Sequence, residues 1–424
     1  MRRPLLVLLF LAACHEDVRL LAGPDAVAVE CMVCADEGGC APVADGTICA
    51  SGVCRAGECV ETTCPGAQRW LAVAAGEAHS CAVGWSGALY CWGANAEGQL
   101  GAGDVEPQGE PVRVAGDWID AGAGWKHTCV LARDGSASCW GKNMEGQVGS
   151  GAVSPSEPAP RPVMDVPALR SVAGGQDHTC AVGVEGGLWC WGKNAENQLG
   201  AAEPDRSPAP LELDDGVPRV WRQVSAGAKH SCGTDLDGRL WCWGGNMEGQ
   251  LGTGGTDPAE TPAEVGAGTS WVEVAAGASH TCAVDAGDRL WCWGDDKDGQ
   301  LGRGDDAEGD RAEEPAPVDS DLGWRAVRVG DKTSCAIATD GTLWCWGKND
   351  AGQLGLGDLE PRRAPARVGG ADDWATLAVG KRHVCGVRTS GGLFCWGDDA
   401  AGQLNLGDLE EHEEPTEVCG DDVE

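Results

Sequence analysis

The chain has 424 residues, with 66 acidic residues against 31 lysines and arginines and a formal net charge of −35. Such acidity repels phosphate backbones and therefore argues against nucleic-acid binding. The 23 cysteines direct attention to disulfides and to an oxidising compartment.

The N-terminus carries features of an export signal. Arg2 and Arg3 precede an apolar run that is too short to span a bilayer, and Leu11-Ala-Ala-Cys14 follows. This segment resembles a bacterial lipoprotein signal. The resemblance implies that residues 1–13 are removed and that Cys14 carries a lipid, with residues 14–30 as a tether. A plain secretory peptide or a buried N-terminal strand would be the alternatives.

Residues 31–63 are predicted to form a small separate module. Six cysteines lie between Cys31 and Cys59. So short a segment cannot bury a core without covalent staples, which favours three disulfides over a ligand site. The connectivity of these six cysteines is left open.

A Cys-Trp-Gly signature then recurs seven times at spacings of 48 to 53 residues. Repeats of about 50 residues are typical of β-propellers. The tryptophans of the signature are Trp92, Trp140, Trp191, Trp243, Trp293, Trp346 and Trp396.

A second cysteine lies ten residues before each of these cysteines, and the segment between them reads as a β-hairpin. Counting outward from a three-residue loop places the two cysteines opposite each other, close enough for a disulfide. Free thiols would not explain the fixed spacing, and two cysteines per repeat are too few for structural zinc. The predicted pairs are Cys81 with Cys91, Cys129 with Cys139, Cys180 with Cys190, Cys232 with Cys242, Cys282 with Cys292, Cys335 with Cys345, and Cys385 with Cys395.

Two further motifs, Gly-x-x-His and Gly-Gln-Leu-Gly, accompany the Trp-Gly of the signature in most repeats. The segments Val73–Val83 and Leu89–Gly101 contain Gly-x-x-His, Trp-Gly and Gly-Gln-Leu-Gly, and this combination resembles the regulator of chromosome condensation repeat family. The resemblance covers roughly residues 66–419 and implies an all-β, seven-bladed β-propeller over residues 64–424. The departures from the pattern are Thr333 for histidine, Asn197 and Asn405 for glycine, and Val148 for leucine.

Two cysteines remain after this partition. Cys64 and Cys419 flank the propeller, and a disulfide between them would lock the ring.

All eight lysines fall in the Gly-x-x-His turns or just after Trp-Gly, and these segments are predicted to share one end of the propeller. In the resembled family the same loops dock proteins, a small GTPase in one member and a β-lactamase in a bacterial inhibitor. We expect a scatter of lysines inside an acidic rim that binds a protein partner. The predicted docking residues are Trp125, Lys126, Lys142, Lys193, Lys229, Lys297, Lys332, Lys348, Lys381 and Arg382.

Neither a catalytic residue nor a metal site or cofactor is predicted. Six of the eight histidines occupy one repeat position, which indicates a structural role. Asp305, Asp306, Glu308 and Asp310 could offer oxygens to calcium, but solvated surface charge is the preferred interpretation.

The sequence thus predicts a monomeric protein-binding or scaffold propeller. It would be extracytoplasmic, in a bacterial cell envelope, and would contact the membrane only through its lipid. A secreted enzyme inhibitor or a carbohydrate-binding propeller is the alternative.

Peptide mapping of the mature protein, isolated without reductant, tests the cysteine partition. We expect no free thiol in the propeller, seven linkages within repeats, and a Cys64–Cys419 bond. Linkages between different repeats, or alkylation without reduction, would contradict the hairpin pairing.

Overall fold

The computed structural model describes residues 69–418, except 109 and 306–308, together with the backbone of five short strands nearer the N-terminus. The described propeller lies in a compact unit that spans Gln68–Val418. The lipidation candidate Cys14, the tether and the predicted Cys64–Cys419 bond lie outside the described residues.

The five N-terminal strands form two small antiparallel sheets. One sheet pairs β1 (Met32–Cys34) with β2 (Cys40–Pro42). The other contains β3 (Ile48–Cys49), β4 (Gly52–Arg55) and β5 (Glu58–Glu61) in sequence order.

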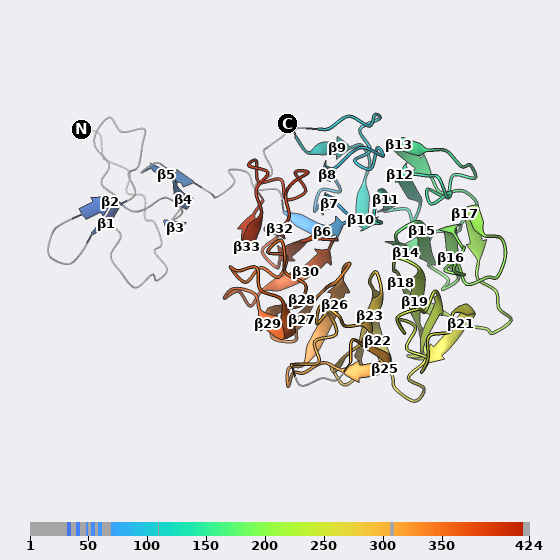
Figure 1. The fold of residues 1–424 in the computed structure, drawn as a ribbon. Helices are drawn as coiled ribbons and strands as arrows, with labels where there is room; N and C mark the ends of the chain where they lie inside the picture. Colours follow the sequence, from blue (N-terminus) through green and yellow to red (C-terminus); the bar gives the residue numbers. More distant parts are fainter. Residues whose placement is uncertain are drawn as a thin grey trace, which may run out of the picture. The chain divides into compact units, whose positions relative to one another are not determined.

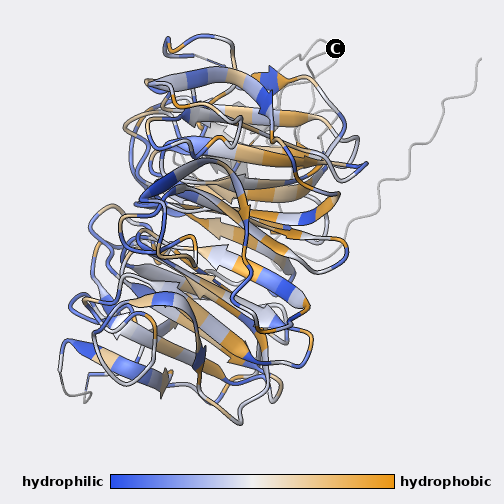
Figure 2. Cartoon of the chain, turned by 90° about the vertical axis from the view of Figure 1, so that its right-hand side faces the viewer, coloured by the Kyte–Doolittle hydropathy of each residue, from blue (hydrophilic) through white to orange (hydrophobic). Residues whose placement is uncertain are grey.

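The larger unit is a seven-bladed β-propeller, as predicted (Figure 1). Each blade is an antiparallel sheet of four strands that follow one another in sequence. The described part of the chain contains no helix, and consequently no helix that could cross a membrane was found there. Apolar residues are frequent along the buried inner strands, whereas outer strands such as β25 and β33 and many connecting loops carry hydrophilic residues (Figure 2).

The first strand of each blade lies nearest the axis and lines a central channel. Its side chains alternate between the interface with the preceding blade and that with the following one, so small residues are frequent. These strands are β6 (Trp70–Ala75), β10 (Trp118–Ala123), β14 (Leu169–Gly174), β18 (Trp221–Ala226), β22 (Trp271–Ala276), β26 (Trp324–Val329) and β30 (Trp374–Val379).

The second strand begins at the repeat histidine, or at Thr333 in the sixth blade, and is almost wholly buried. These strands are β7 (His79–Gly84), β11 (His127–Ala132), β15 (His178–Gly183), β19 (His230–Asp235), β23 (His280–Asp285), β27 (Thr333–Ala338) and β31 (His383–Arg388).

The third strand carries the Cys-Trp-Gly signature, which is also buried. These strands are β8 (Leu89–Gly93), β12 (Ala137–Lys142), β16 (Leu188–Lys193), β20 (Leu240–Gly244), β24 (Leu290–Asp295), β28 (Leu343–Gly347) and β32 (Leu393–Gly397).

The fourth strand forms the outer edge of its blade, where the prolines that most of these strands contain are tolerated. These strands are β9 (Val112–Val114), β13 (Ser156–Pro162), β17 (Arg206–Glu212), β21 (Ala259–Val265), β25 (Arg311–Pro317), β29 (Arg362–Arg367) and β33 (His412–Glu417).

The hairpin between the second and third strands has the predicted three-residue loop. In the first blade the Gly84 amide donates to the Ala88 carbonyl, and Gly87 closes the loop at φ 83°. Side chains other than that of glycine seldom adopt this left-handed conformation. The fifth blade has Asp288 at this position, at φ 59°.

All seven predicted disulfides within blades are present. The two cysteines face each other in the ladder between the second and third strands, and the two Cα atoms of every pair are 4.1 Å apart. This separation is close to that of a non-hydrogen-bonded antiparallel pair. The disulfides join Cys81 to Cys91, Cys129 to Cys139, Cys180 to Cys190, Cys232 to Cys242, Cys282 to Cys292, Cys335 to Cys345, and Cys385 to Cys395.

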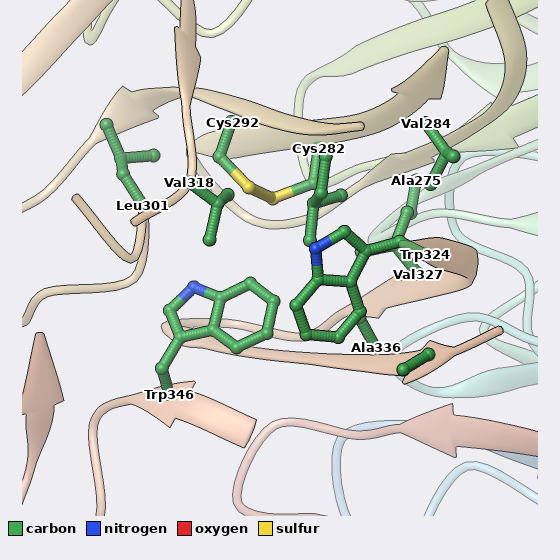
Figure 3. Close-up of a cluster of buried hydrophobic side chains, with 12 residues drawn as sticks. Ala275, Cys282, Val284, Cys292, Leu301, Val318, Trp324, Val327, Ala336 and Trp346 are labelled. Atoms are coloured by element: carbon green, nitrogen blue, oxygen red, sulfur yellow. A yellow bond between two sulfur atoms is a disulfide. The ribbon is translucent and has the colours of Figure 1, made fainter. Parts of the chain in front are cut away.

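The core lies between blades. In the contact between the fifth and sixth blades, the Cys282–Cys292 disulfide and Leu301 of one blade face Trp324 and Trp346 of the next (Figure 3). The other six clusters likewise combine buried residues of two neighbouring blades. Because each blade buries its apolar face only against a neighbour, stability depends on the closed ring.

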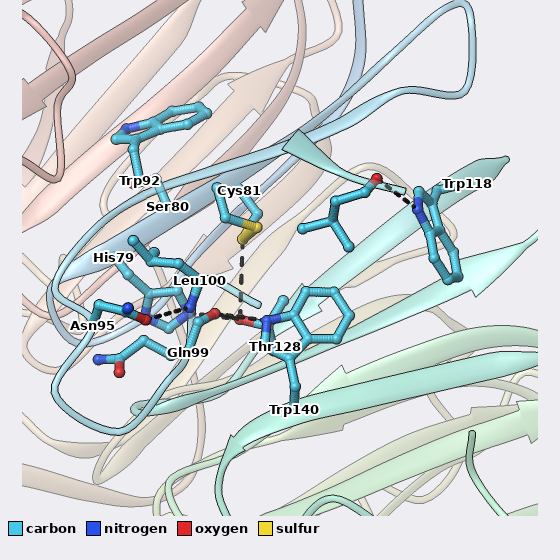
Figure 4. The surroundings of a disulfide bond; sticks show 12 residues. His79, Ser80, Cys81, Trp92, Asn95, Gln99, Leu100, Trp118, Thr128 and Trp140 are labelled. Carbon is cyan, nitrogen blue, oxygen red and sulfur yellow. Dashed lines mark hydrogen bonds between the residues drawn. A yellow bond between two sulfur atoms is a disulfide. The ribbon is translucent and has the colours of Figure 1, made fainter. Parts of the chain in front are cut away.

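One backbone carbonyl per blade organises each junction. The Gln99 carbonyl of the first blade accepts hydrogen bonds from Trp140 Nε1 and Thr128 Oγ1 of the second, each at 2.8 Å (Figure 4). The Thr128 hydroxyl in turn contacts His79 Nε2 at 3.0 Å. Since this hydroxyl donates to the carbonyl, we infer that the histidine carries its proton on Nε2.

The glycine of Gly-x-x-His is explained by the same junction. A Cβ atom on Gly76 would lie 2.5 Å from His79 Nδ1 and 2.6 Å from the Gly124 carbonyl of the next blade. Any side chain at this position would therefore displace either the imidazole or the neighbouring blade.

The junction between the sixth and seventh blades lacks both polar partners. Thr333 replaces the histidine, and buried Val384 stands where the other blades have a serine or threonine. Trp396 still donates to the Gln353 carbonyl at 3.1 Å. The paired loss leaves neither a buried imidazole N–H nor a buried hydroxyl without a partner.

In the described residues, the first and last blades are each built from four consecutive strands, so neither blade borrows a strand from the other end of the chain. Ser80 and Trp92 of the first blade donate to the Gln403 carbonyl of the last, at 2.9 and 2.8 Å. His383 contacts Ser80 at 2.9 Å. Closure thus repeats the contacts of the internal junctions.

The six junction histidines should make the fold sensitive to acid. Burial lowers their pKa values from 6.5 to about 3 or about 4, so they are neutral in the fold and take up protons on unfolding. The neutral imidazoles therefore contribute fully to the free energy of unfolding above pH 6.5. This contribution is lost as the pH falls from 6.5 toward about 4. Combining His178→Thr with Ser231→Val should reduce the slope of unfolding free energy against pH, by up to about 1.4 kcal/mol per pH unit.

The single change Ser231→Val is the control. It keeps the imidazole and therefore the slope of unfolding free energy against pH. Because it leaves the Nε2–H of His178 without an acceptor, it should lower the free energy of unfolding by roughly 1–3 kcal/mol at pH 7. Denaturant unfolding at pH 7.5, 6 and 5 measures both quantities. An unchanged slope in the double variant would contradict the role of the buried imidazole.

Candidate protein-binding face

The predicted docking residues lie at one end of the propeller. The first and third strands run in the same direction, so the turns after the first and the loops after the third share an end. This end, called the lysine end, carries Trp125, Lys126, Lys142, Lys193, Lys229, Lys297, Lys332, Lys348, Lys381 and Arg382. The hairpin loops between the second and third strands form the opposite, hairpin end.

Most cations of the lysine end are paired with carboxylates of the same end. Every junction between blades is bridged by at least one ion pair at this end, and the junction between the second and third blades has a further pair, Arg206–Glu145, at 3.8 Å. In order around the ring the pairs are Lys126–Glu77, Lys142–Asp177, Lys229–Glu196, Lys297–Glu248, Lys332–Asp298, Arg382–Asp350 and Lys381–Glu77, with N–O distances of 2.6 to 3.7 Å.

Two lysines lie outside this set of bridges. Lys348 pairs with Asp350 of its own blade at 2.9 Å. Lys193 has no ion pair in the described part of the chain. A surface ion pair contributes at most about 1 kcal/mol to stability. The bridges therefore fix the positions of the lysine side chains but add little to the stability of the ring.

Trp125 is at the centre of one cluster on this face. Lys381 Nζ lies 5.2 Å from the centre of its ring, within the range of a cation–π contact. The Trp125 carbonyl accepts a hydrogen bond from the Glu77 amide at 2.9 Å. The Glu77 carboxylate lies 2.6 Å from Lys381 and 3.7 Å from Lys126. The cluster joins the seventh, first and second blades across the ring closure.

The sequence did not single out Glu77, although it orders both lysines. The available signal was an acidic residue at the second position of a Gly-x-x-His turn, where the seventh blade has Lys381, next to the third position, where the second blade has Lys126. Its role becomes visible only when the ring brings the second and seventh blades to the two sides of the first.

The cluster lies at the mouth of the central channel. The channel has a volume of about 410 Å³ and is lined by the seven first strands with the turns that follow them, including Trp125 and Lys381. Burial raises the pKa of Asp120 in the wall, and burial also raises that of Asp331 near the mouth. Among the wall residues, Arg328 is bound to Glu273 at 2.5 Å.

Exposed apolar side chains occur at both ends. Met144 and Met247 protrude from the loops after Trp-Gly at the lysine end, and Met247 is 73% exposed. Trp85, Val184 and Leu236 are exposed in the hairpin loops at the other end. Apolar exposure alone therefore does not select a docking face.

The repeat histidines are committed to the junctions. All six have buried side chains whose Nε2 contacts a hydroxyl of the next blade at 2.8 to 3.0 Å. Within residues 69–418, apart from the gaps, no group of three or more histidine, cysteine or acidic side chains is placed to hold a metal ion.

The fold and its repeated junction define a disulfide-bonded, seven-bladed propeller built from seven consecutive repeats. A family model described as an RCC1-like domain matches residues 18–330. Models of the regulator of chromosome condensation (RCC1) repeat match residues 340–387, and residues 324–353 and 374–403. The chain belongs to the RCC1-like domain family.

Curated relatives include a receptor and a ligase. The ultraviolet-B receptor UVR8 of Arabidopsis thaliana is 31% identical over 321 residues, which cover 73% of this chain and 71% of the receptor. The probable E3 ubiquitin-protein ligase HERC3 of Homo sapiens is 34% identical over 100 residues, 23% of this chain and 9% of the ligase. The family match alone therefore does not decide between a binding protein and an enzyme.

Solved structures show the same fold. Human WBSCR16 superposes with a TM-score of 0.71 at 22% identity, covering 78% of this chain and 93% of that one. Yeast RCC1 (Prp20), in a complex with Kap60, gives 0.70 at 20% identity, with 78% and 83% covered.

Proposed function

We propose that this chain is an extracytoplasmic protein-binding propeller whose partner docks on the lysine end around Trp125. The observation that carries the proposal is the Trp125 cluster, in which an aromatic ring stands beside Lys381 at the channel mouth. Tryptophan flanked by charged groups is a frequent anchor of protein interfaces.

The loops around the cluster are held in place before any partner arrives. In the first blade the Asn95 side chain accepts a hydrogen bond from the Leu100 amide, and the Gln99 side chain accepts one from the Glu97 amide. The ion-pair bridges fix the neighbouring turns. Such preordering lowers the entropic cost of binding.

The chemistry of the surface favours a protein partner. The paired lysines leave a mixed-charge face with an aromatic anchor, and the net charge of −35 disfavours phosphate backbones. Among propellers of similar fold, yeast RCC1 was solved bound to Kap60, and Prp20p is described by its binding to Gsp1p and histones. Those partners support the proposal that this chain also binds a protein. They are not proposed as its own partners.

Export and lipid anchoring form part of the proposal. The seven disulfides support an oxidising compartment, because such bonds rarely persist in the cytosol. Cys14 is the proposed site of lipid attachment. The propeller would then be held at a membrane of the cell envelope while its lysine end stays available to a partner.

Two matched double variants test the docking face. Trp125→Ala with Lys126→Glu should weaken capture of the partner by more than about 1–2 kcal/mol, or roughly 5- to 30-fold in Kd. Trp85→Ala with Arg133→Glu removes a tryptophan and reverses a paired cation at the hairpin end. Trp85 has Arg69 at 5.0 Å, and Arg133 pairs with Asp117 at 3.1 Å, so the two variants lose similar contacts.

Capture from cell-envelope extract, quantified by mass spectrometry, identifies the species that wild type binds and that the first variant loses. Thermal unfolding of both variants checks that the fold is kept. If only the hairpin-end variant lost binding, the assignment of the docking face to the lysine end would be wrong.

Replacing Cys14 tests the anchor. Cys14→Ser should abolish incorporation of labelled fatty acid and leave the protein unprocessed or released from the membrane. Membrane association of the native protein without any attached fatty acid would instead favour ordinary secretion.

A further inference from the structure

The loop after Trp-Gly contains a buried glutamine in every blade. The side-chain oxygen of this glutamine accepts a hydrogen bond from the backbone amide two residues earlier. Its Nε2 group needs an acceptor of its own, because a buried amide donor without a partner costs free energy. The glutamines are Gln99, Gln147, Gln198, Gln250, Gln300, Gln353 and Gln403.

In four blades a carboxylate accepts a hydrogen bond from this Nε2 group. The carboxylate comes from one of three positions: directly after Trp-Gly, two residues farther along the loop, or in the Gly-x-x-His turn of the next blade. The pairs are Gln147 with Asp177, Gln300 with Asp295, Gln353 with Asp350 and Gln403 with Asp398, at N–O distances of 2.9 to 3.4 Å.

The third blade has no carboxylate at any of these three positions. Lys193 follows Trp-Gly, Ala195 stands two residues farther along, and Lys229 lies in the turn of the fourth blade. Of the seven glutamines, all within the described part of the chain, Gln198 alone has a buried Nε2 without a hydrogen-bond partner. Lys193 has no ion pair in the described residues, and Lys229 has only Glu196, at 3.5 Å. Donors thus remain where other blades place an acceptor.

The sixth blade has the same two cations and also the carboxylate. Lys348 follows its Trp-Gly, and Arg382 lies in the turn of the seventh blade. Asp350 Oδ2 lies 2.9 Å from Lys348 Nζ and 3.6 Å from Arg382 Nη2. Asp350 Oδ1 accepts a hydrogen bond from Gln353 Nε2 at 3.3 Å. One carboxylate therefore satisfies all three donors, and in the third blade the exposed Ala195 stands in its place.

The second blade shows independently that the lysine and the glutamine reach one atom. Lys142 Nζ lies 2.7 Å and Gln147 Nε2 3.4 Å from the same oxygen, Asp177 Oδ1. The corresponding groups of the third blade are Lys193 and Gln198. An oxygen atom between them would be held in the same way.

The loop of the third blade has the backbone course of the loops in the second and sixth blades. In each of them the lysine amide donates to the carbonyl at the end of the Gly-x-x turn, at 2.8 to 3.0 Å. An asparagine side chain accepts from the amide five residues later at 2.9 to 3.1 Å, whereas Asp296 and Asp399 replace this asparagine in the fifth and seventh blades. Asn197 has a φ of 64°, near the 82° of Gly146 and the 71° of Gly352. The three loops can therefore be compared residue by residue.

The local charge favours an anion although the chain is acidic overall. Lys193 and Lys229 place two positive charges beside the single negative charge of Glu196. Arg206 stands opposite Lys193 in the ladder with the outer strand, although it pairs with Glu145 of the second blade at 3.8 Å. At physiological ionic strength the Debye length is about 8 Å, so the more distant acidic loops are largely screened.

We propose that the junction between the third and fourth blades binds a carboxylate through Lys193 Nζ and Gln198 Nε2, with Lys229 Nζ beside them. The carboxylate belongs to an aspartate or glutamate of the protein that docks on the lysine end, and this part rests on the proposed function. A carboxylate offers two acceptor oxygens, which is how Asp350 serves several donors in the sixth blade. A partner that covers both this site and Trp125 would span the second to fourth blades.

Nuclear magnetic resonance of the full-length, disulfide-intact protein, labelled with 15N-glutamine, tests the site itself. Sodium acetate is the probe and replaces sodium chloride at constant ionic strength and pH 7.5. The side-chain amide signals of Gln198 should shift saturably in wild type. Ala195→Asp supplies the carboxylate from the chain, as Asp350 does, and should abolish the shift. Ala96→Asp adds the same charge at the same loop position of the first blade, where no lysine follows Trp-Gly, and should keep the shift.

The sixth blade offers the converse experiment. Asp350→Ala removes the internal carboxylate, so the side-chain amide of Gln353 should begin to respond to acetate as well. If the Gln198 signals do not shift in wild type, or shift equally in Ala195→Asp, the carboxylate site is wrong.

Capture from cell-envelope extract tests the source of the carboxylate. Ala195→Asp should weaken capture of the partner about fivefold or more, whereas the hairpin-end variant Trp85→Ala with Arg133→Glu should not. If Trp125→Ala with Lys126→Glu loses the partner and Ala195→Asp keeps it, the partner does not supply the carboxylate and this proposal is wrong. If neither variant loses the partner while acetate still shifts Gln198, the docking face is wrong and the carboxylate site stands.

Discussion

The ring depends on a backbone carbonyl, that of the glutamine in each Gly-Gln-Leu loop. Each one accepts a hydrogen bond from the signature tryptophan of the next blade at 2.8 to 3.1 Å, and at six junctions a hydroxyl adds a second. These groups are buried, where an unsatisfied polar atom is costly. The disulfide fixes the hairpin that presents the histidine and the tryptophan. The glycine before that histidine lets the next blade approach.

Because every junction repeats these contacts, the blades form a scaffold whose loops can vary. Closure between the last and first blades uses the same carbonyl, with the side chains of Ser80 and His383, which lie 303 residues apart in sequence. The ion pairs of the lysine end cross the same seven junctions. Trp125 then has a defined setting at the channel mouth, although its loop contains no regular structure.

Departures from the repeat differ in whether a neighbour compensates for them. Thr333 is matched by Val384, and the charge of Asp296 is matched by Arg303. Asn197 and Asn405 keep the positive φ of the glycines they replace, at 64° and 56°. Asp399 keeps only one of its two oxygens bonded, and the other is left without a partner.

The sequence by itself determined the number of blades, the hairpins and the cysteine pairs, because these are written in the repeat period and in residues ten positions apart. It also indicated that the repeat histidines are structural, without showing their partners. Only the tertiary structure decided that His79 contacts Thr128, that Glu77 pairs with Lys126 and Lys381, and that Asp399 Oδ2 has no hydrogen-bond partner. These contacts join residues of different blades, or depend on which atoms a buried side chain faces. The contacts between blades become defined only when the ring is closed, and the environment of Asp399 only when the loop of its own blade is folded.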